Sequence, residues 1–420
     1  MEAKIVQLKD SVAEHIEESV TVEDAVTEIT LSKTPTSEPV KMLINGIAYG
    51  EGNSVTVDRA GKKVTWTGEF PLNANTVDSL QLLYVTGEKT PAIHVYGMVL
   101  VQEGNRTGTW VRVDKDFNIV EFDAAAHGTW AGIKQVMNDT YGEFTEIPVT
   151  YVKTETLADG PYAGKNCWWI ADGHVEDFHV HPAFIGQDGQ PHNLQIASYL
   201  TSYKATTGNH YSEDKGTTAD GYRNVSHDML QRDFGWMTGG ARPYTIYDHH
   251  FLARMMLTEF GTPDMQAQMV DGVAWTGANR INYHGIYDPF GTPNSTKSYW
   301  LYGLVTYNGT YRVLAANGSM NNIVNTGVST SIYRVWPTNC RVDQANGIDF
   351  GDLFIASSSN SSENFGSFAD RQELASSYPQ YSSGYAVRWD TASEKGAFFL
   401  EQAGTGDFEN IGWRLARCTG

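Results

Sequence analysis

The chain has 420 residues, and at roughly 150 residues per domain this length predicts two or three domains with at least one full-sized core. Its 30 basic and 49 acidic side chains give a formal net charge of −19, which argues against nucleic-acid binding because that binding depends on cations that neutralise phosphates. No apolar run approaches the roughly 20 residues that cross a bilayer, so we expect a soluble chain without membrane insertion. Glycine (41 residues) and aromatic residues (12%) are abundant, a mix typical of short strands joined by many turns.

The N-terminus and the cysteines bear on the compartment in which the protein is assembled. Residues 1–4 begin no apolar segment with a small-residue cleavage site, so we expect no Sec signal. Cys167, Cys340 and Cys418 are an odd number of cysteines spread over the chain, whereas a disulfide framework needs more and closer ones. We therefore expect reduced thiols in a protein assembled in the cytoplasm.

Residues 1–27 carry apolar side chains at spacings of three or four among charged residues, without glycine or proline. The apolar positions are Ile5, Leu8, Val12, Ile16 and Val20. This pattern predicts an amphipathic helix. Because an isolated helix of this size is marginal in water, its apolar stripe should pack either on other copies of the chain or on its own domain.

Residues 28–90 change to a period of two, which is typical of strands. The expected strands are 29–32, 40–44, 54–57, 63–67 and 80–85. Turn-forming residues such as Asn45 and Gly46 separate them. This spacing predicts a small antiparallel β-sandwich, and the polar segment 86–91 predicts a linker after it.

Residues 91–420 show a mixed pattern. Short strands are expected at 98–101, 109–113, 299–306, 311–315, 331–336, 385–389 and 396–400. Apolar residues recur at helical intervals from Leu252 to Phe260, and Gly261 follows them, so a helix is predicted over 247–260. The remainder is rich in glycine, asparagine and serine, which predicts long loops between short strands.

His179 and His181 form the sharpest local cluster of candidate metal ligands. Alternating histidines project from one face of a strand, as metal ligands do, and Gly173 completes the first half of a cupin-like Gly-x5-His-x-His pattern. Ile185 and Gly186 stand where the second half of that pattern requires its glutamate. We therefore expect these histidines to cap turns or satisfy buried carbonyls rather than to hold a metal.

The other candidate catalytic groups give weaker patterns. His249 and His250 point about 100° apart on a helix, so one metal is not expected to bind both, and Asp248 fits a helix N-cap or a first-turn acid. The run 226–228 (Ser-His-Asp) is consecutive, whereas a catalytic triad is assembled in space. No spacing singles out a carboxylate pair for glycoside cleavage. We expect no catalytic residue, no metal and no cofactor.

Aromatic residues give the better indication of function. Those in or beside loops rich in serine, asparagine and glycine are Trp336, Tyr378, Tyr381, Tyr385 and Trp389. Recognition surfaces use this composition, because rigid rings supply contact area and small polar residues adapt to the ligand. The sequence predicts ligand binding by these five residues; the alternative is that at least half of the rings lie in the core.

Several short motifs carry a family resemblance. In the last quarter they are 351–354 (Gly-Asp-Leu-Phe), the Ser/Asn-rich 357–362, 383–385 (Ser-Gly-Tyr), 396–400 (Gly-Ala-Phe-Phe-Leu) and 410–417 (Asn-Ile-Gly-Trp-Arg-Leu-Ala-Arg). Upstream they are 168–170, 178–184 and 251–268. Together these motifs resemble the C-type-lectin-like domain of tailed-phage structural and receptor-binding proteins, a fold shared with formylglycine-generating enzymes. The strands near 44–49 and 64–66 resemble small β-domains of phage virions.

The spacing patterns and the resemblance together predict an α+β fold in three parts. The patterns supply an N-terminal helix for attachment or oligomerisation (1–27) and a small antiparallel β-sandwich (28–90), and the resemblance implies a C-type-lectin-like α+β domain with long loops (91–420). The enzymes of this fold use a closely spaced cysteine pair, but Cys340 and Cys418 lie far apart. The calcium-binding lectins carry Glu-Pro-Asn or Gln-Pro-Asp in one loop and Trp-Asn-Asp in another part of the domain, and none of these triplets is present. The implied role is a calcium-independent display scaffold.

The resemblance therefore implies a structural protein of a phage virion, either a tail fibre or a head fibre or capsid decoration. Its expected partners are further copies of the chain in a homotrimer, other virion proteins, and a polysaccharide or protein of the host surface. The alternative is an enzyme: either a metal-dependent one that uses His179, His181 and His249, or a capsule depolymerase that uses acidic residues.

Overall fold

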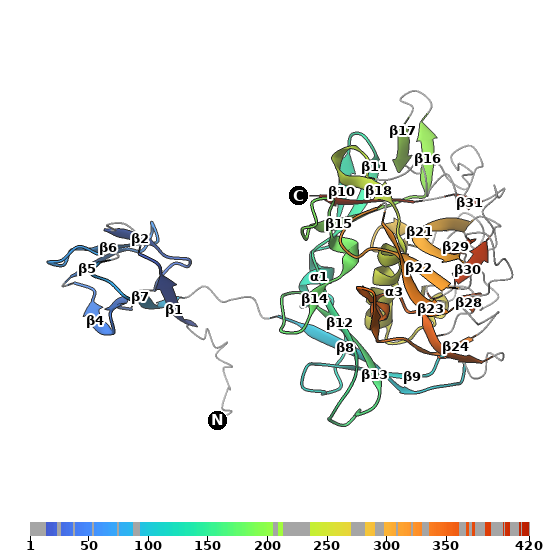
Figure 1. Cartoon of the computed structure of the whole chain (residues 1–420), viewed down its shortest axis with the longest axis horizontal. Coiled ribbons are helices and arrows are strands. Elements are labelled where there is room, and N and C mark those ends of the chain that lie inside the picture. Colours follow the sequence, from blue (N-terminus) through green and yellow to red (C-terminus); the bar gives the residue numbers. More distant parts are fainter. Residues whose placement is uncertain are drawn as a thin grey trace, which may run out of the picture. The chain divides into compact units, whose positions relative to one another are not determined.

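The computed structural model of the chain divides into two compact units, Met1–Ala92 and Ile93–Gly420 (Figure 1). The structure describes residues 14–22, 27–36, 38–52, 54–73, 75–86, 93–204, 209–212, 236–269, 282–289, 298–307, 310–320, 322–329, 336–360, 367–368, 372–373, 383–387, 398, 400–403, 411–412 and 414–419.

Two antiparallel sheets make up the described part of the first unit. Their strand orders are β1-β7-β3-β4 and β2-β6-β5. The bounds are β1 Glu14–Val20, β2 Glu28–Thr30, β3 Lys41–Ile44, β4 Ile47–Gly50, β5 Val55–Asp58, β6 Lys63–Trp66 and β7 Leu80–Thr86. Every second residue of β7 is buried (Leu80, Leu82 and Tyr84), and these side chains share one apolar core with Met42 of β3 and Val64 of β6. The predicted strands at 40–44, 54–57, 63–67 and 80–85 are confirmed, within a residue or two at each end.

The N-terminal helix predicted over 1–27 is wrong where the structure describes this segment, because Glu14–Val20 forms strand β1. The strand runs antiparallel to β7, with Ile16 opposite Tyr84 and Val20 opposite Leu80. Isoleucine and valine are β-branched and favour strands, and β7 offers backbone hydrogen bonds along the edge that β1 occupies. Residues 1–13 and most of the predicted linker lie outside the described residues.

Three larger sheets dominate the second unit (Figure 1). The first has the order β16-β17-β11-β15-β32-β18, with β10 paired to β11; the second is β14-β12-β13-β8-β9; the third is β23-β22-β21-β29-β30-β28, with β31 paired to β21. In chain order the bounds are β8 Val95–Gln102, β9 Thr109–Val113, β10 Lys134–Asn138, β11 Gly142–Ile147, β12 Tyr151–Thr156, β13 Asn166–Ala171, β14 His179–Val180, β15 Asn193–Ala197, β16 Thr201–Lys204, β17 Asn209–Ser212, β18 Ala241–Pro243, β21 Ser298–Tyr307, β22 Thr310–Leu314, β23 Ile323–Ser329, β28 Gln372–Glu373, β29 Ser383–Val387, β30 Leu400–Ala403, β31 Ile411–Gly412 and β32 Leu415–Thr419.

Two-stranded pairs complete the described strands of this unit. They are β19 (Asn282–Tyr283) with β20 (Ile286–Tyr287), β24 (Trp336–Cys340) with β27 (Ala356–Asn360), and β25 (Gln344–Ala345) with β26 (Ile348–Asp349).

Helix α3 (Ile246–Phe260) packs inside the second unit, in contact with strands β8, β13 and β21. Thr245 caps its N-terminus: the Thr245 hydroxyl accepts from the backbone N–H of Asp248, and the Asp248 carboxylate accepts from the backbone N–H of Thr245. Gly261 ends the helix with a φ of 70°, a conformation that favours glycine. The predicted helix over 247–260 and the first-turn role of Asp248 are confirmed.

The predicted α+β fold class, with a C-type-lectin-like second part, is wrong. The described residues lie mostly in strands of many small, largely antiparallel sheets, and they show no clear lectin arrangement. Besides α3, the α-helices among them are the short α1 (Gly128–Ala131) and α4 (Met265–Met269). Glycine- and aromatic-rich motifs mark turns and buried strand positions in any β-rich fold, so these motifs did not specify one topology. No helix in the described part of the chain is long and apolar enough to cross a membrane.

Candidate functional site

The structure describes two of the five aromatic residues predicted to bind a ligand. Trp336 begins β24, and its side chain is only 6% exposed, so its ring is a buried one rather than the surface contact that the sequence suggested. The backbone of Tyr385 lies in β29. Tyr378, Tyr381 and Trp389 lie outside the described residues, and their role stays a prediction.

The two histidines of the predicted metal pair have different surroundings. His179 keeps 40% of its side chain exposed, and its Nε2 lies 2.8 Å from a carboxylate oxygen of Asp352. His181 is fully buried, and its Nδ1 accepts a hydrogen bond from the backbone N–H of Ala183 at the start of the 3-10 turn η1 (Pro182–Phe184). The turn-capping role expected for His181 is confirmed, and burial lowers its pKa to about 3.

His249 and His250 are both buried in α3, with ring centroids 5.2 Å apart. Among the residues that the structure describes, neither ring nitrogen of His250 has a hydrogen-bond partner, and burial lowers its pKa well below the ordinary value. The run 226–228 lies outside the described residues. Within the described part, the group of side chains that could hold a metal ion joins His179 to Asp349 and Asp352 rather than to His181 or His249.

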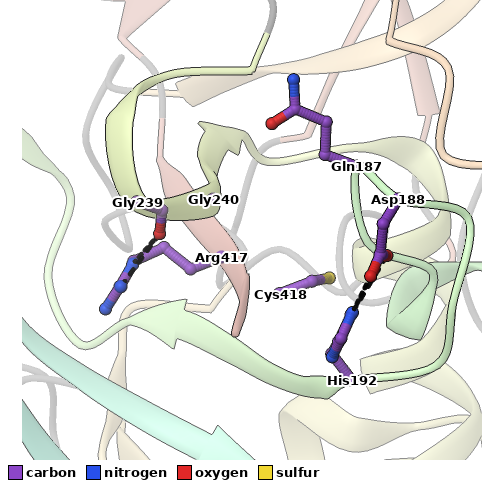
Figure 2. Close-up of a pocket in the computed structure, with 7 residues that line it drawn as sticks. All are labelled: Gln187, Asp188, His192, Gly239, Gly240, Arg417 and Cys418. Carbon is purple, nitrogen blue, oxygen red and sulfur yellow. Dashed lines mark hydrogen bonds and ion pairs between the residues drawn. The ribbon is translucent and has the colours of Figure 1, made fainter. Parts of the chain in front are cut away.

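An open cleft with a volume of about 770 Å³ is a candidate for ligand binding in the described structure (Figure 2). Its lining residues are Gln187, Asp188, His192, Gly239, Gly240, Arg417 and Cys418. The volume falls in the range of about 300–1,000 Å³ that small-molecule sites occupy. The cleft therefore has room for a ligand of that size.

One wall of the cleft is the loop that precedes β15. Ile185 pairs with Pro191 across the loop, and the N–H of Gly186 donates to the carbonyl of Gln190 at 2.9 Å. Gly189 takes a φ of 75° at the tip, where its N–H donates to the carbonyl of Gly186. The turn fixes the backbone at Gln187 and Asp188, which line the cleft.

A charged pair lies on this wall. Figure 2 shows Asp188 and His192 directed toward one another, with a carboxylate oxygen 2.9 Å from Nε2 of the imidazole. The backbone N–H of Gln190 also donates to Asp188, and this bond, followed by the contact with His192, lowers the pKa of the carboxyl. Asp188 keeps 55% of its side chain exposed, so it remains accessible to a ligand as a hydrogen-bond acceptor.

Arg417 of β32 forms the opposite wall. Its Nε and Nη2 donate to the carbonyl of Gly239, and its Nη1 donates to Oε1 of Gln195 at 2.8 Å. These bonds fix the guanidinium, as Figure 2 shows for the contact with Gly239. Gly240 adopts a φ of 73°, and a Cβ atom there would lie 2.6 Å from the carbonyl oxygen of Cys418, so only glycine allows this close approach to β32.

Cys418 lies in the cleft lining with its thiol turned into the protein. The residue is 5% exposed, and Sγ donates to the carbonyl of Ala183 at 3.2 Å. Burial raises the pKa of this thiol, so it stays protonated near neutral pH and is a poor nucleophile. The lining supports hydrogen bonding to a ligand: Asp188 accepts, the amide of Gln187 donates and accepts, and Arg417 carries donors.

Comparison with known proteins supplies no relative: no family model and no curated protein matches this chain. No local sequence pattern singles out Asp188 or His192, and Arg417 stands out only as the end of the motif 410–417. The glycines at 186 and 189, with polar residues between them, are a turn signal that locates the loop. Nothing local indicates that the loop faces β32.

Proposed function

We propose that this chain is a structural protein of a phage particle that binds a polysaccharide of the host surface, and that the cleft between the 185–192 loop and β32 holds part of that polysaccharide. Motifs of the sequence that resemble phage virion proteins support the particle assignment. The observation that carries the binding assignment is the cleft of about 770 Å³ with hydrogen-bonding groups on opposite walls.

The groups in the cleft match the chemistry of sugars. A sugar hydroxyl both donates and accepts, so it needs an acceptor such as Asp188 and donors such as Gln187 and Arg417 within one cavity. Asp188 and Arg417 carry opposite charges on the two walls, which favours a ligand without a strong net charge. Hydrogen bonds to charged groups also orient a ligand more strongly than neutral ones.

A single open cleft gives weak affinity, and a particle compensates by presenting many copies. Joining binding sites raises overall avidity by about 10²–10⁴ without new contacts. We therefore propose a homo-oligomer, with a trimer as the expected state. Light scattering on the purified chain, whose monomer mass is 46.4 kDa, tests this: a trimer supports the assembly, and a monomer at micromolar concentration contradicts it.

Binding is tested on arrays of capsular and lipopolysaccharide sugars with the full chain and two variants, Asp188→Asn and His192→Gln. Asp188→Asn removes a charged acceptor at the cleft and His192→Gln removes the imidazole that contacts it, and we expect about tenfold weaker binding by each variant. Asp116→Asn is the matched control, because Asp116 is similarly exposed (65%) but is absent from the cleft lining. Equal binding by all four proteins would exclude the cleft as the sugar site.

The particle assignment needs a separate measurement. Gold-labelled antibodies against the chain, imaged by electron microscopy on phage particles from the culture that produces it, should decorate an exposed part of the virion. Labelling of tail or head surfaces supports the proposal and also distinguishes a fibre from a capsid decoration. A protein found only in the lysate, and never on particles, contradicts it.

A further inference from the structure

A second group of chemically active side chains lies apart from the cleft lining, where β14 meets the 3-10 turn η4 (Phe350–Asp352). His179 comes from β14, Asp349 precedes η4 and Asp352 ends it. Each offers one ligand atom, and these three atoms lie within 4.8 Å of one another. Nitrogen and oxygen ligands at about 2.0–2.2 Å from a common ion fit within such a spacing after small side-chain rotations.

Neighbouring groups hold both carboxylates in place. The Nη2 of Arg254 donates to Oδ1 of Asp352 at 3.2 Å, which leaves Oδ2 toward His179. The carboxylate of Asp349 accepts from the backbone N–H of Gly351 at 2.9 Å and from the side chain of Gln344 at 3.0 Å. Carboxylates that bind metals are supported by hydrogen bonds of this kind, and such partners matter for affinity.

The group is buried on the side of Asp352 and exposed to solvent on the side of His179. Asp352 and Arg254 have side chains 1% and 0% exposed, whereas the side chain of His179 is 40% exposed. An ion can therefore reach the group from solvent, and water can complete its coordination. Two carboxylates so close repel each other, and the proximity of Asp352, added to burial, raises the pKa of Asp349.

A buried histidine, His181, lies next to the group but is not one of its candidate ligands. His181 is fully buried, and its Nδ1 accepts from the backbone N–H of Ala183, so its Nε2 carries the proton. That Nε2 faces the backbone of Asp352, so His181 approaches the group without belonging to the ligand set. A nitrogen that carries a proton donates a hydrogen bond and cannot coordinate a cation.

We propose that His179, Asp349 and Asp352 bind one divalent transition-metal ion, with Zn²⁺ as the representative, and that the ion links β14 to the η4 turn. One imidazole and two carboxylates form a mixed nitrogen and oxygen set, which suits such ions better than Ca²⁺ or Mg²⁺, whose ligands are oxygens. Arg254 is a positioning residue that holds Asp352. The inference is independent of the sugar-binding proposal, since the two sites share no residue.

Equilibrium dialysis of the full chain against Zn²⁺, with the bound metal measured by atomic absorption, tests the proposal. We expect one tightly bound ion for the unmodified chain. His179→Ala and Asp349→Asn should each weaken this binding by more than about tenfold. Loss of a residue that only supports a metal ligand already weakens metal binding by about tenfold, and loss of a ligand should cost more. A parallel dialysis against Ca²⁺ should give at least about tenfold weaker binding, because imidazole is a poor ligand for that ion.

The matched control is His174→Ala, because His174 is an exposed histidine of the same segment that is not part of the group. It should bind Zn²⁺ as the unmodified chain does. Circular dichroism confirms that each variant is folded, and His179→Ala decides the question if Asp349→Asn does not fold, since His179 is the more exposed residue. Absence of a tight ion in the unmodified chain, or equal binding by His179→Ala, would overturn the proposal.

Discussion

Arg242 and Asp248 form a buried two-point ion pair in which both terminal nitrogens of the guanidinium donate to the two carboxylate oxygens. Their side chains are 3% and 0% exposed. The same Arg242 also donates to the carbonyl of Ala183 and contacts the sulfur of Cys418, while Asp248 caps helix α3 through Thr245. Through Arg242, this pair therefore links the start of helix α3 to Cys418 in the cleft lining.

Replacement of Asp248 by Asn should destabilise the second unit by about 3–5 kcal/mol, because it leaves a buried guanidinium without its counter-charge. Chemical denaturation followed by tryptophan fluorescence measures the loss. The control is Asp116→Asn, which breaks an exposed contact with Lys115 and should cost less than about 1 kcal/mol. A similar loss of unfolding free energy in both variants would show that the buried pair stabilises the unit no more than the exposed contact does.

Buried histidines should make the protein sensitive to acid. Burial lowers the pKa of His127 to about 4 and that of His250 well below its ordinary value, whereas both titrate near 6.5 once unfolded. Between these values the unfolded chain binds protons that the folded chain does not, so stability is full above pH 6.5 and falls as the pH drops toward 4. Each histidine contributes a slope of about 1.4 kcal/mol per pH unit over this window.

Denaturation curves at pH 7.5, 6 and 5 test this expectation for the folded protein. His250→Leu should reduce the slope by about 1.4 kcal/mol per pH unit, because leucine fills a similar space without titrating. His174→Leu replaces an exposed histidine of the same unit and serves as the matched control variant. A stability that stays constant between pH 7.5 and 5 would contradict the assignment of neutral buried imidazoles.

The elements that the sequence predicted well are those whose signals are local. Asp248 stands in the first turn, apolar residues recur after it and Gly261 supplies the left-handed end, so the predicted helix over 247–260 agrees with α3 almost to the residue. Asn45 and Gly46 likewise adopt the positive φ values, 50° and 81°, of a tight hairpin turn. These signals depend on neighbours within a few residues and survive in any fold.

The errors have non-local causes. Ile16 and Val20 fit a helix by spacing, yet they pair with Tyr84 and Leu80, partners far away in the sequence. The candidate sites depend on pairings of the same kind: β15 lies beside β32, and Asp352 lies beside His179. Spacing identified His179 but could not supply its partners, because only the folded sheets bring these segments together.

Gly240→Ala should damage the cleft, since the new Cβ would lie 2.6 Å from the carbonyl oxygen of Cys418 at a φ of 73°. Gly164→Ala is the matched control, because Gly164 has a similar φ of 80° but nothing within 4 Å of the added atom. Both should lose about 1 kcal/mol from backbone strain, and Gly240→Ala should lose about 1–3 kcal/mol more from the clash. Denaturation measures both, and equal losses would show that β32 moves aside freely.

The cysteines should be unreactive in the folded protein. Cys167, Cys340 and Cys418 are 0%, 1% and 5% exposed, and burial raises the pKa of each thiol. Attack by an aromatic disulfide reagent needs a thiolate, so it requires local opening, and an opening free energy of about 3 kcal/mol slows the reaction by roughly a hundredfold. Cys418 should react first because it lines the cleft. The reagent's absorbance measures the rate of reaction in buffer. The same protein in denaturant should release three equivalents of the reagent's chromophore quickly. If all three thiols react as fast in buffer as in denaturant, the cysteines are not buried.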